Sequence, residues 1–170
     1  MVLFMERITQ AELKSLLTYN EETGYFYWKN LVGYRSKVAG KKAGTLNARG
    51  YIAINISSRP MLAHRLAWLY MHGEWPSLQI DHINGVRTDN RIANLRLATR
   101  YENMRNIKRK STNKSGYKGV SWSAECKKWR ACIVHQGKTV HLGVFTEKDA
   151  AYEAYCNAAS QFYGPFARLD

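Results

Sequence analysis

One stretch of the sequence decides the fold. It consists of Ile80-Asp81-His82-Ile83-Asn84-Gly85, followed by Asp89-Asn90-Arg91-Ile92-Ala93-Asn94-Leu95-Arg96-Leu97-Ala98-Thr99. Two short apolar runs, residues 78–80 and 95–97, flank a polar loop rich in Asn, Gly, Arg and Asp. Apolar runs bounded by such turn-forming residues predict strands. We therefore expect two strands joined by a long loop, and a helix over residues 100–109.

The residues before this stretch predict a compact platform of helices and strands. Helical spacing and strand-like alternation of apolar and aromatic residues indicate four elements. These are a helix over residues 11–17, a strand over 25–28, a strand over 51–56 and a helix over 61–71. We assign residues 1–58 to an N-terminal α/β platform and residues 59–109 to a core built around the deciding stretch.

A basic segment separates this core from the remainder of the chain. No acidic residue occurs between Asn103 and Ala124, and we place a basic linker at residues 110–115. Such a run can be merely a solvated segment. Its position between two ordered regions favours contact with nucleic-acid phosphates.

Residues 116–170 predict a three-stranded antiparallel sheet packed on one helix. The strands are expected over residues 116–123, 128–136 and 138–145, separated by short turns. A helix over residues 147–161 follows, and its many alanines provide a small-residue face that can pack closely on a sheet. The predicted fold class is therefore α+β.

The charge of the chain indicates a polyanionic partner. Lys and Arg number 26 against 13 acidic residues, which gives a formal net charge of +13. Nucleic acid and an anionic membrane surface both fit this charge, but no apolar run is long enough to span a bilayer. The first residues lack the pattern of a secretory signal, and we expect no membrane association. The three cysteines contain no C-x-x-C pair and predict reduced, packed side chains.

The deciding stretch, together with Glu102-Asn103-Met104-Arg105-Asn106, resembles the HNH nuclease motif. In that family a strand, a loop, a second strand and a helix surround one metal ion, and the order Asp-His, Asn, Asn is the same here. The resemblance implies a ββα-metal (HNH) nuclease core and metal-dependent hydrolysis of DNA phosphodiesters. The segment Asp81–Gly85 alone would equally fit an ordinary turn.

The resemblance also implies roles for four residues. His82 is the expected general base, since a neutral imidazole can take a proton from water near physiological pH. Asp81 is expected to bind the metal, and Asn103, 22 residues further on, resembles the second ligand. Asn94 matches the middle Asn of the motif, whose family role is to hold the loop and orient the histidine.

Oxygen ligands of this kind favour a hard cation, so we expect Mg²⁺, with Mn²⁺ as a substitute and no small-molecule cofactor. Some relatives have histidines at the metal positions, where this chain has Asp81 and Asn103. His64 also recurs in the subfamily pattern, but a histidine on an apolar helix is more often a packed residue, and we leave it outside the core site.

Residues 116–168 resemble the APETALA/ethylene-response-factor type of DNA-binding domain, through Gly-Tyr-Lys-Gly-Val-Ser-Trp, Lys-Trp-Arg-Ala-Cys-Ile and His-Leu-Gly-Val-Phe. In that family a three-stranded sheet enters the major groove while the helix supports its back. Several arginine positions of the plant relatives are here Ser121, Ser123 and Val134, so the sequence preference does not carry over.

The expected DNA contacts are basic side chains from both regions. They are Arg96, Arg105, Lys108, Arg109, Lys110, Lys118, Arg130 and His141. Each can equally be an ordinary surface cation, and contacts to phosphate alone position a protein without reading sequence.

Together the two resemblances, with residues 20–28, imply a free-standing, homing-type HNH endonuclease of bacteriophages. We expect it to act on double-stranded DNA in the cytoplasm of a bacterial host. One motif means one active site, so a monomer is expected to nick, and the oligomeric state stays open. Two alternatives remain: a catalytically silent, sequence-specific DNA-binding regulator, and an RNA-binding protein.

Overall fold

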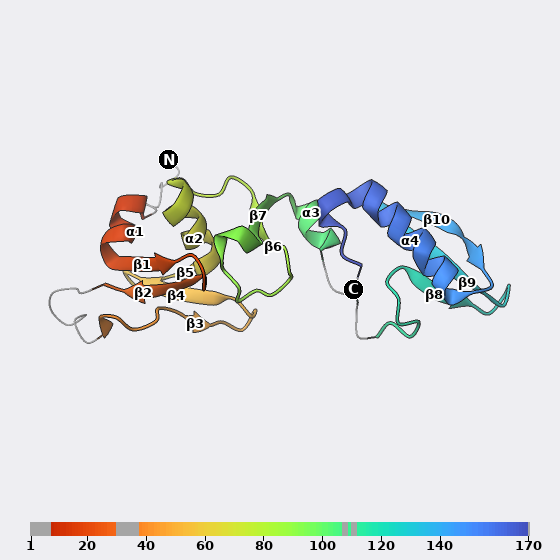
Figure 1. Ribbon diagram of the computed structural model, residues 1–170, viewed down its shortest axis with the longest axis horizontal. Coiled ribbons are helices and arrows are strands. Elements are labelled where there is room, and N and C mark those ends of the chain that lie inside the picture. Colours follow the sequence, from red (N-terminus) through yellow and green to blue (C-terminus); the bar gives the residue numbers. More distant parts are fainter. Residues whose placement is uncertain (1–7, 30–37, 107–108, 110–111, 170) are drawn as a thin grey trace, which may run out of the picture. The chain divides into compact units, whose positions relative to one another are not determined.

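The structure, a computed structural model, describes residues 8–29, 38–106, 109 and 112–169. The chain has mixed α and β structure and divides into two compact units, Met1–Thr99 and Arg100–Asp170 (Figure 1). Within the described residues, none of the helices has the length and apolar character needed to cross a membrane.

The first unit begins with a helix and a hairpin. Helix α1 (Gln10–Leu16) starts at Thr9, whose hydroxyl accepts the Glu12 N–H at 3.2 Å while the Glu12 carboxylate accepts the Thr9 N–H at 2.8 Å. This reciprocal capping fixes the start of the helix. Strands β1 (Leu17–Asn20) and β2 (Tyr25–Trp28) follow as an antiparallel pair.

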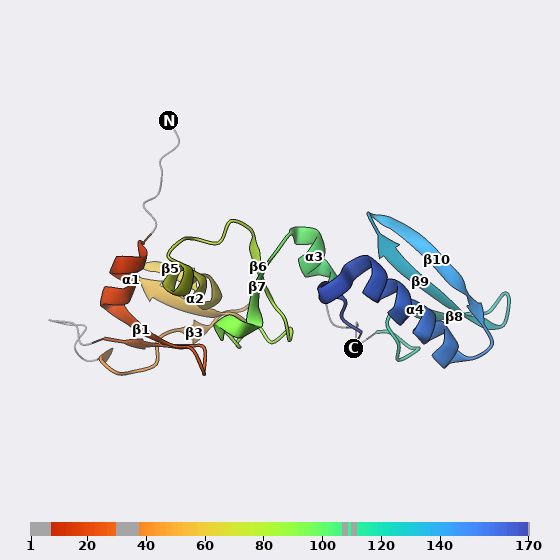
Figure 2. The ribbon, with the colours of Figure 1, turned by 45° about the horizontal axis from the view of Figure 1, so that its top comes forward.

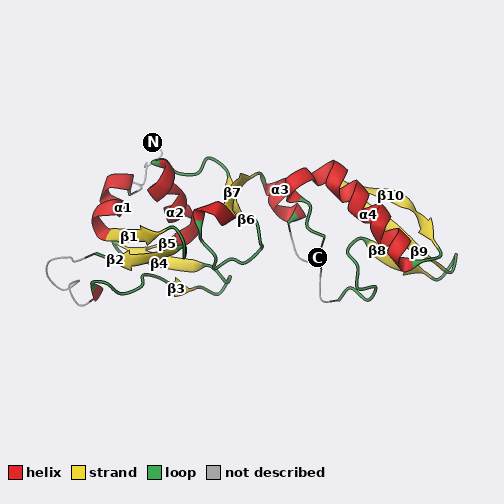
Figure 3. Cartoon of the chain, in the orientation of Figure 1, coloured by secondary structure: helices red, strands yellow, loops and turns green. Residues whose placement is uncertain are grey.

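A three-stranded antiparallel sheet comes next, with the order β3 (Thr45–Leu46), β4 (Ile52–Ile56), β5 (Arg59–Leu62). The β4–β5 turn has Ser57 and Ser58 at φ 50° and 63°, a conformation that suits the twist of a hairpin. Helix α2 (Ala63–His72) follows β5 directly (Figure 3), and it ends at Gly73 with φ 82°.

Strands β6 (Gln79–His82) and β7 (Leu95–Ala98) form a separate antiparallel pair, with the 3₁₀ turn η2 (Ile92–Asn94) just before β7. Ile80 and Leu95 are buried in the same core as Phe26, Ile54 and Leu66. The two strands are therefore anchored to the helices and sheets of the platform through one continuous apolar core.

The second unit contains α3 (Arg100–Arg105), a sheet of order β10 (Lys138–Phe145), β9 (Lys128–His135), β8 (Val120–Ser123), helix α4 (Lys148–Tyr163) and the 3₁₀ turn η3 (Gly164–Phe166). Helix α4 lies along one face of this sheet (Figure 2) and buries Ala151, Tyr155 and Ala159 against it. Gly119 has φ 75°, and a Cβ there would lie 2.1 Å from the Tyr155 ring, so only glycine fits.

Candidate active site

Strand β6 carries the two side chains that the motif singles out. Asp81 and His82 are each only 4% exposed. They are consecutive residues of one strand, so their side chains leave opposite faces. Asp81 is the cross-strand partner of Arg96, and its Oδ2 accepts Arg96 Nε at 2.8 Å and Nη2 at 2.7 Å. The buried carboxylate is thus neutralised by Arg96, one of the predicted DNA contacts.

His82 has a hydrogen bond that defines its tautomer. Its Nε2 lies 3.1 Å from Oδ1 of Asn90, which is 1% exposed. An amide oxygen only accepts, so Nε2 carries the proton of the neutral ring and Nδ1 keeps the basic lone pair. Burial lowers the His82 pKa, and this outweighs the raising effects of Asn90 and Asp81. The ring is therefore neutral near physiological pH, as a general base must be.

Asn90 is itself held by the N-terminal hairpin. The Tyr19 hydroxyl donates to the Asn90 carbonyl oxygen at 2.7 Å, within the core, and burial raises the Tyr19 pKa to about 12. At Gly24, in the β1–β2 turn, a Cβ would lie 2.4 Å from Arg91 N and 2.5 Å from Asn90 C. The hairpin backbone thus packs directly on Asn90, the residue that is hydrogen-bonded to His82.

Asn94 organises the loop between β6 and β7. Its Oδ1 accepts Asn84 N at 3.0 Å, and its Nδ2 donates to Asn84 Oδ1 at 3.0 Å and to the Asp89 carbonyl at 2.8 Å. Asp89 pairs with Arg91, whose hydrogen bonds lower the Asp89 pKa to about 2. His82 Nε2 thus donates to Asn90 Oδ1, while Asn94 fixes the loop that carries Asn90.

Two aromatic rings pack against His82. The His64 ring centre lies 5.1 Å away, edge to face, and the Tyr51 ring centre 6.0 Å away. His64 is 6% exposed, and its Nδ1 has no hydrogen-bond partner among the described residues. Burial, with smaller contributions from His82 and Arg65, lowers the His64 pKa to about 3, so this ring is neutral. His64, which we left outside the core site, is a buried wall of the His82 environment.

The two predicted metal ligands, Asp81 and Asn103, carry oxygen donors of the kind that a hard cation prefers. Within the described residues, no cluster of three or more His, Cys, Asp or Glu side chains could hold a metal. Asp81 supplies carboxylate oxygen, and Mg²⁺ commonly binds through one or two carboxylates while keeping several waters. Asn103 is a half-buried residue of α3, in the second unit, and its role as an amide ligand stays a prediction.

The other side chains that the sequence predicts to contact DNA differ in their surroundings. Lys118 Nζ donates to the carbonyl oxygens of Arg105 and Arg168, at 3.2 and 3.0 Å, and the Arg105 guanidinium lies 4.7 Å from the Tyr163 ring centre. Arg109 is exposed, whereas Lys108 and Lys110 lie outside the described residues. Arg130 and His141 are exposed on neighbouring strands β9 and β10.

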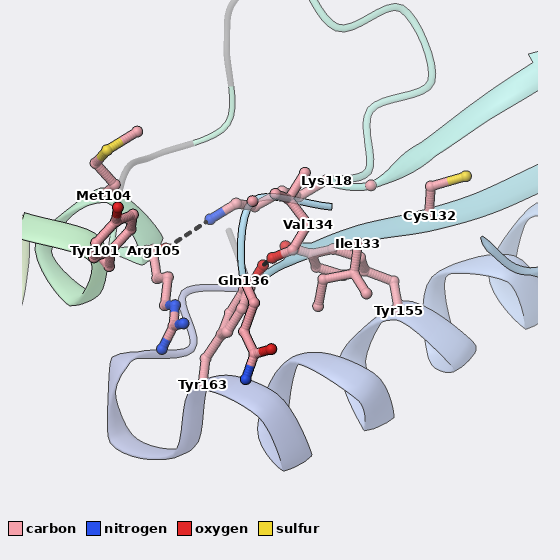
Figure 4. A pocket seen from close by; sticks show the side chains of 12 residues that line it. Tyr101, Met104, Arg105, Lys118, Cys132, Ile133, Val134, Gln136, Tyr155 and Tyr163 are labelled. Atoms are coloured by element: carbon pink, nitrogen blue, oxygen red, sulfur yellow. Dashed lines mark hydrogen bonds between the residues drawn. The ribbon is translucent and has the colours of Figure 1, made fainter. Parts of the chain in front are cut away.

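A cavity of about 420 Å³ lies within the second unit and is mostly apolar. Figure 4 shows Lys118 reaching across it toward α3, with Tyr101 and Met104 on the helix side and Tyr155 on α4. Its lining comes entirely from the second unit.

Sequence reasoning missed Asn90, Tyr51 and Arg87. The Arg87 guanidinium lies 5.0 Å from the Tyr51 ring centre, in the loop after β6. Asn90 stands inside the matched stretch, but the motif gives none of the three residues a role, because their relation to His82 comes from tertiary packing. The adjacency of Asn90 to the matched residues of the loop was the one available signal.

Comparisons with known proteins agree with this geometry. A family model described as HNH endonuclease matches residues 61–105. Protein 3.8 of Escherichia phage T7 is 41% identical over 76 residues, which are 44% of this chain and 63% of that protein. An uncharacterized HNH endonuclease of Acanthamoeba polyphaga mimivirus is 30% identical over 132 residues, covering 76% of this chain and 67% of the relative.

Among solved structures, the HNH homing endonuclease I-HmuI, described for DNA binding and cleavage, aligns with a TM-score of 0.44 and 22% identity. The alignment covers 60% of this chain and 57% of that one. This chain therefore spans less than two thirds of the length of the phage T7 relative and of I-HmuI.

Proposed function

The chain belongs to the HNH endonuclease family, and from this premise we propose that it is a metal-dependent DNA endonuclease in which His82 activates water. The observation that carries the proposal is the state of His82. Its ring is buried, is neutral because burial lowers its pKa, and donates a hydrogen bond from Nε2 to Asn90 Oδ1. An unprotonated Nδ1 on a ring held in one tautomer is what a general base at a phosphodiester requires.

In the proposed reaction, His82 Nδ1 takes a proton from water as the water oxygen bonds to phosphorus. The bond between phosphorus and the 3′ oxygen breaks, and the leaving oxygen is protonated from solvent. The products are a 5′-phosphate and a 3′-hydroxyl. A single divalent cation, Mg²⁺ or Mn²⁺, held by Asp81 and by the predicted ligand Asn103, would supply positive charge that stabilises the leaving oxygen.

The sheet face of the second unit is the proposed DNA-binding surface. Arg130 and His141 are exposed there, and Ser121 and Val144 are the cross-strand neighbours of Arg130. A net charge of +13 supports a phosphate backbone as the partner. The homing-type role and the APETALA-like mode of binding in the major groove belong to this proposal through the sequence resemblance.

The test is conversion of supercoiled plasmid to nicked or linear DNA with Mg²⁺ or Mn²⁺. EDTA and the variant His82→Ala serve as paired controls. We expect cutting that is lost with EDTA and reduced about 1000-fold in His82→Ala, because general-base catalysis contributes about 10²- to 10⁴-fold.

Binding of the same DNA by both proteins shows that the variant is folded and that chemistry, rather than affinity, is lost. Cutting by His82→Ala at the wild-type rate would remove the central claim. Tight DNA binding without any metal-dependent cutting would favour the silent regulator instead.

A further inference from the structure

We propose that Arg87 forms a phosphate-binding subsite next to His82 and binds the DNA phosphate that is cut. This inference rests on the proposed nuclease function, because it names the group that would hold the substrate at the same site. Arg87 lies in the β6–β7 loop, five residues after His82, and its side chain is exposed.

Two contacts hold the Arg87 side chain in place. Its guanidinium lies 5.0 Å from the centre of the Tyr51 ring, within cation–π range. Its Nη1 donates to the Arg49 carbonyl oxygen at 2.8 Å, a bond that joins positions 38 residues apart. The β6–β7 loop is thus attached to the β3–β4 turn through one arginine, and its charged end has a defined position.

The same Tyr51 ring also contacts the site of the general base. Its centre lies 6.0 Å from the His82 ring and 5.2 Å from the His64 ring. Arg87 and His82 therefore both lie close to the Tyr51 ring. A phosphate bound by Arg87 would be brought to the neighbourhood of the nitrogen that activates water.

The guanidinium has unused hydrogen-bonding capacity that matches this ligand. It carries five N–H donors in a planar fork that suits two phosphate oxygens. Among the described residues, the structure gives Arg87 one hydrogen bond, to Arg49. Arg96, the arginine on the neighbouring strand, instead directs two nitrogens to the buried Asp81 carboxylate. Arg91, in the same loop, is exposed but directs two nitrogens to the Asp89 carboxylate. Among the described residues, Arg87 is thus the exposed arginine of the β6–β7 loop whose charge is not paired with a carboxylate.

The first experiment measures single-turnover plasmid nicking at saturating protein. Arg87→Met removes the charge and keeps much of the side-chain volume, and Arg87→Lys keeps the charge but loses the fork. Arg59→Met is the matched control, because Arg59 is an exposed arginine of the same unit, on β5. We expect a rate loss of about 100-fold for Arg87→Met, as for removal of one transition-state donor, and an intermediate loss for Arg87→Lys.

The cutting rates of Tyr51 variants give an independent test of the Arg87 subsite. Tyr51→Phe keeps the aromatic ring and is expected to retain more of the cutting rate than Tyr51→Leu. Tyr51→Leu removes the ring face and is expected to lose about 10-fold, with little further loss when combined with Arg87→Met. Full additivity of Tyr51→Leu and Arg87→Met would contradict a shared role.

The closing experiment does not depend on cutting. In His82→Ala protein labelled with ¹⁵N, the Arg87 side-chain Nε–H signal is assigned by its loss in the Arg87→Met double variant. It is then followed while a short random-sequence DNA duplex is added. We expect a saturable shift of this signal that increased salt reverses.

An Arg87 signal that stays unmoved while other arginine signals shift would overturn the subsite, even if the wild-type protein cuts DNA. A shift of the Arg87 signal in a chain whose wild type cuts no DNA would show that Arg87 contacts DNA but would refute both the nuclease and the binding of a phosphate that is cut. Wild-type cutting rates in Arg87→Met would also overturn the inference.

Discussion

The polar residues around His82 in the first unit and those on the sheet face of the second unit differ in their burial. In the first, Asp81, His82, Asn90 and Asn94 are all buried, and each has a defined hydrogen-bond partner. In the second, Arg130 and His141 are exposed on a sheet. Buried polar groups cost free energy unless they are paired, so a cluster of this kind persists only where the surrounding structure fixes it.

This difference separates two physical tasks. Proton transfer requires a base with a fixed position and tautomer, and a displacement of about 1 Å can cost about 100-fold in rate. Contact with a phosphate backbone tolerates flexible side chains, because each such contact adds a small charge-dependent increment. Single substitutions should therefore have large effects in the first unit and small effects on the sheet face of the second.

Apart from His82→Ala, the largest expected effect is that of Asn90→Leu, which is similar in size to that of Arg87→Met. This change removes the oxygen that accepts from His82 Nε2, so the tautomer with a basic Nδ1 is no longer favoured. We expect a loss of about 100-fold in the single-turnover rate of plasmid nicking, with DNA affinity unchanged. Asn55→Leu is the matched control, since Asn55 is an exposed residue of β4.

Asn90→Asp separates this role from a general effect on folding. The carboxylate keeps an acceptor at the position of Oδ1, and its charge favours the protonated imidazole. We expect this variant to cut well above the rate of Asn90→Leu, with the acid limb of its pH profile shifted upward. Equal rates for the two variants would show that Asn90 acts only as a packed residue.

The second effect is on stability rather than rate. Burial lowers the His64 pKa to about 3, whereas the unfolded chain takes up a proton near the ordinary value of 6.5. The unfolded state therefore binds more protons between these two values, and stability is present above pH 6.5 and is lost as pH falls.

The contribution of His64 to this loss is at most about 1.4 kcal/mol per pH unit. Replacing it, as in His64→Phe, should flatten the dependence of the unfolding free energy on pH by about that amount. Urea unfolding at pH values between about 7 and 5 measures the two slopes. Parallel slopes for wild type and variant would mean that His64 is not a buried neutral base.

The sequence was sufficient where a feature depends on residues close together in the chain. Asp81 and His82 belong to a short motif, and the strands expected around residues 78–80 and 95–97 correspond to β6 and β7, which extend by one or two residues. The aromatic neighbours of His82 were not predictable, because Tyr51, just before β4, and His64, on α2, reach it through packing of the first unit.

Local backbone conformation accounts for two further differences. Residues 59–62 form β5, although the expected helix began at residue 61, because the preceding Ser57–Ser58 turn adopts positive φ without the Gly or Asn that signals a hairpin. Strand β8 begins at Val120 rather than residue 116, since Gly119 has positive φ and packs on Tyr155. Both depend on contacts or conformations that side-chain periodicity does not encode.

The smallest expected effect concerns the sheet face, where Arg130→Ala removes one exposed cation. If Arg130 contacts a phosphate, its loss should weaken DNA binding several-fold and reduce the slope of log affinity against log salt by about one.

Lys118→Ala removes the same charge from the same unit, but Lys118 Nζ donates hydrogen bonds to the carbonyl oxygens of Arg105 and Arg168. Its loss should lower the unfolding free energy by about 1 kcal/mol and leave the salt slope close to that of the wild type. Fluorescence anisotropy over a range of salt concentrations distinguishes the two variants. A reduced slope in Lys118→Ala with an unchanged slope in Arg130→Ala would reverse the assignment and would mean that DNA lies against the Lys118 side of the unit rather than against the open sheet.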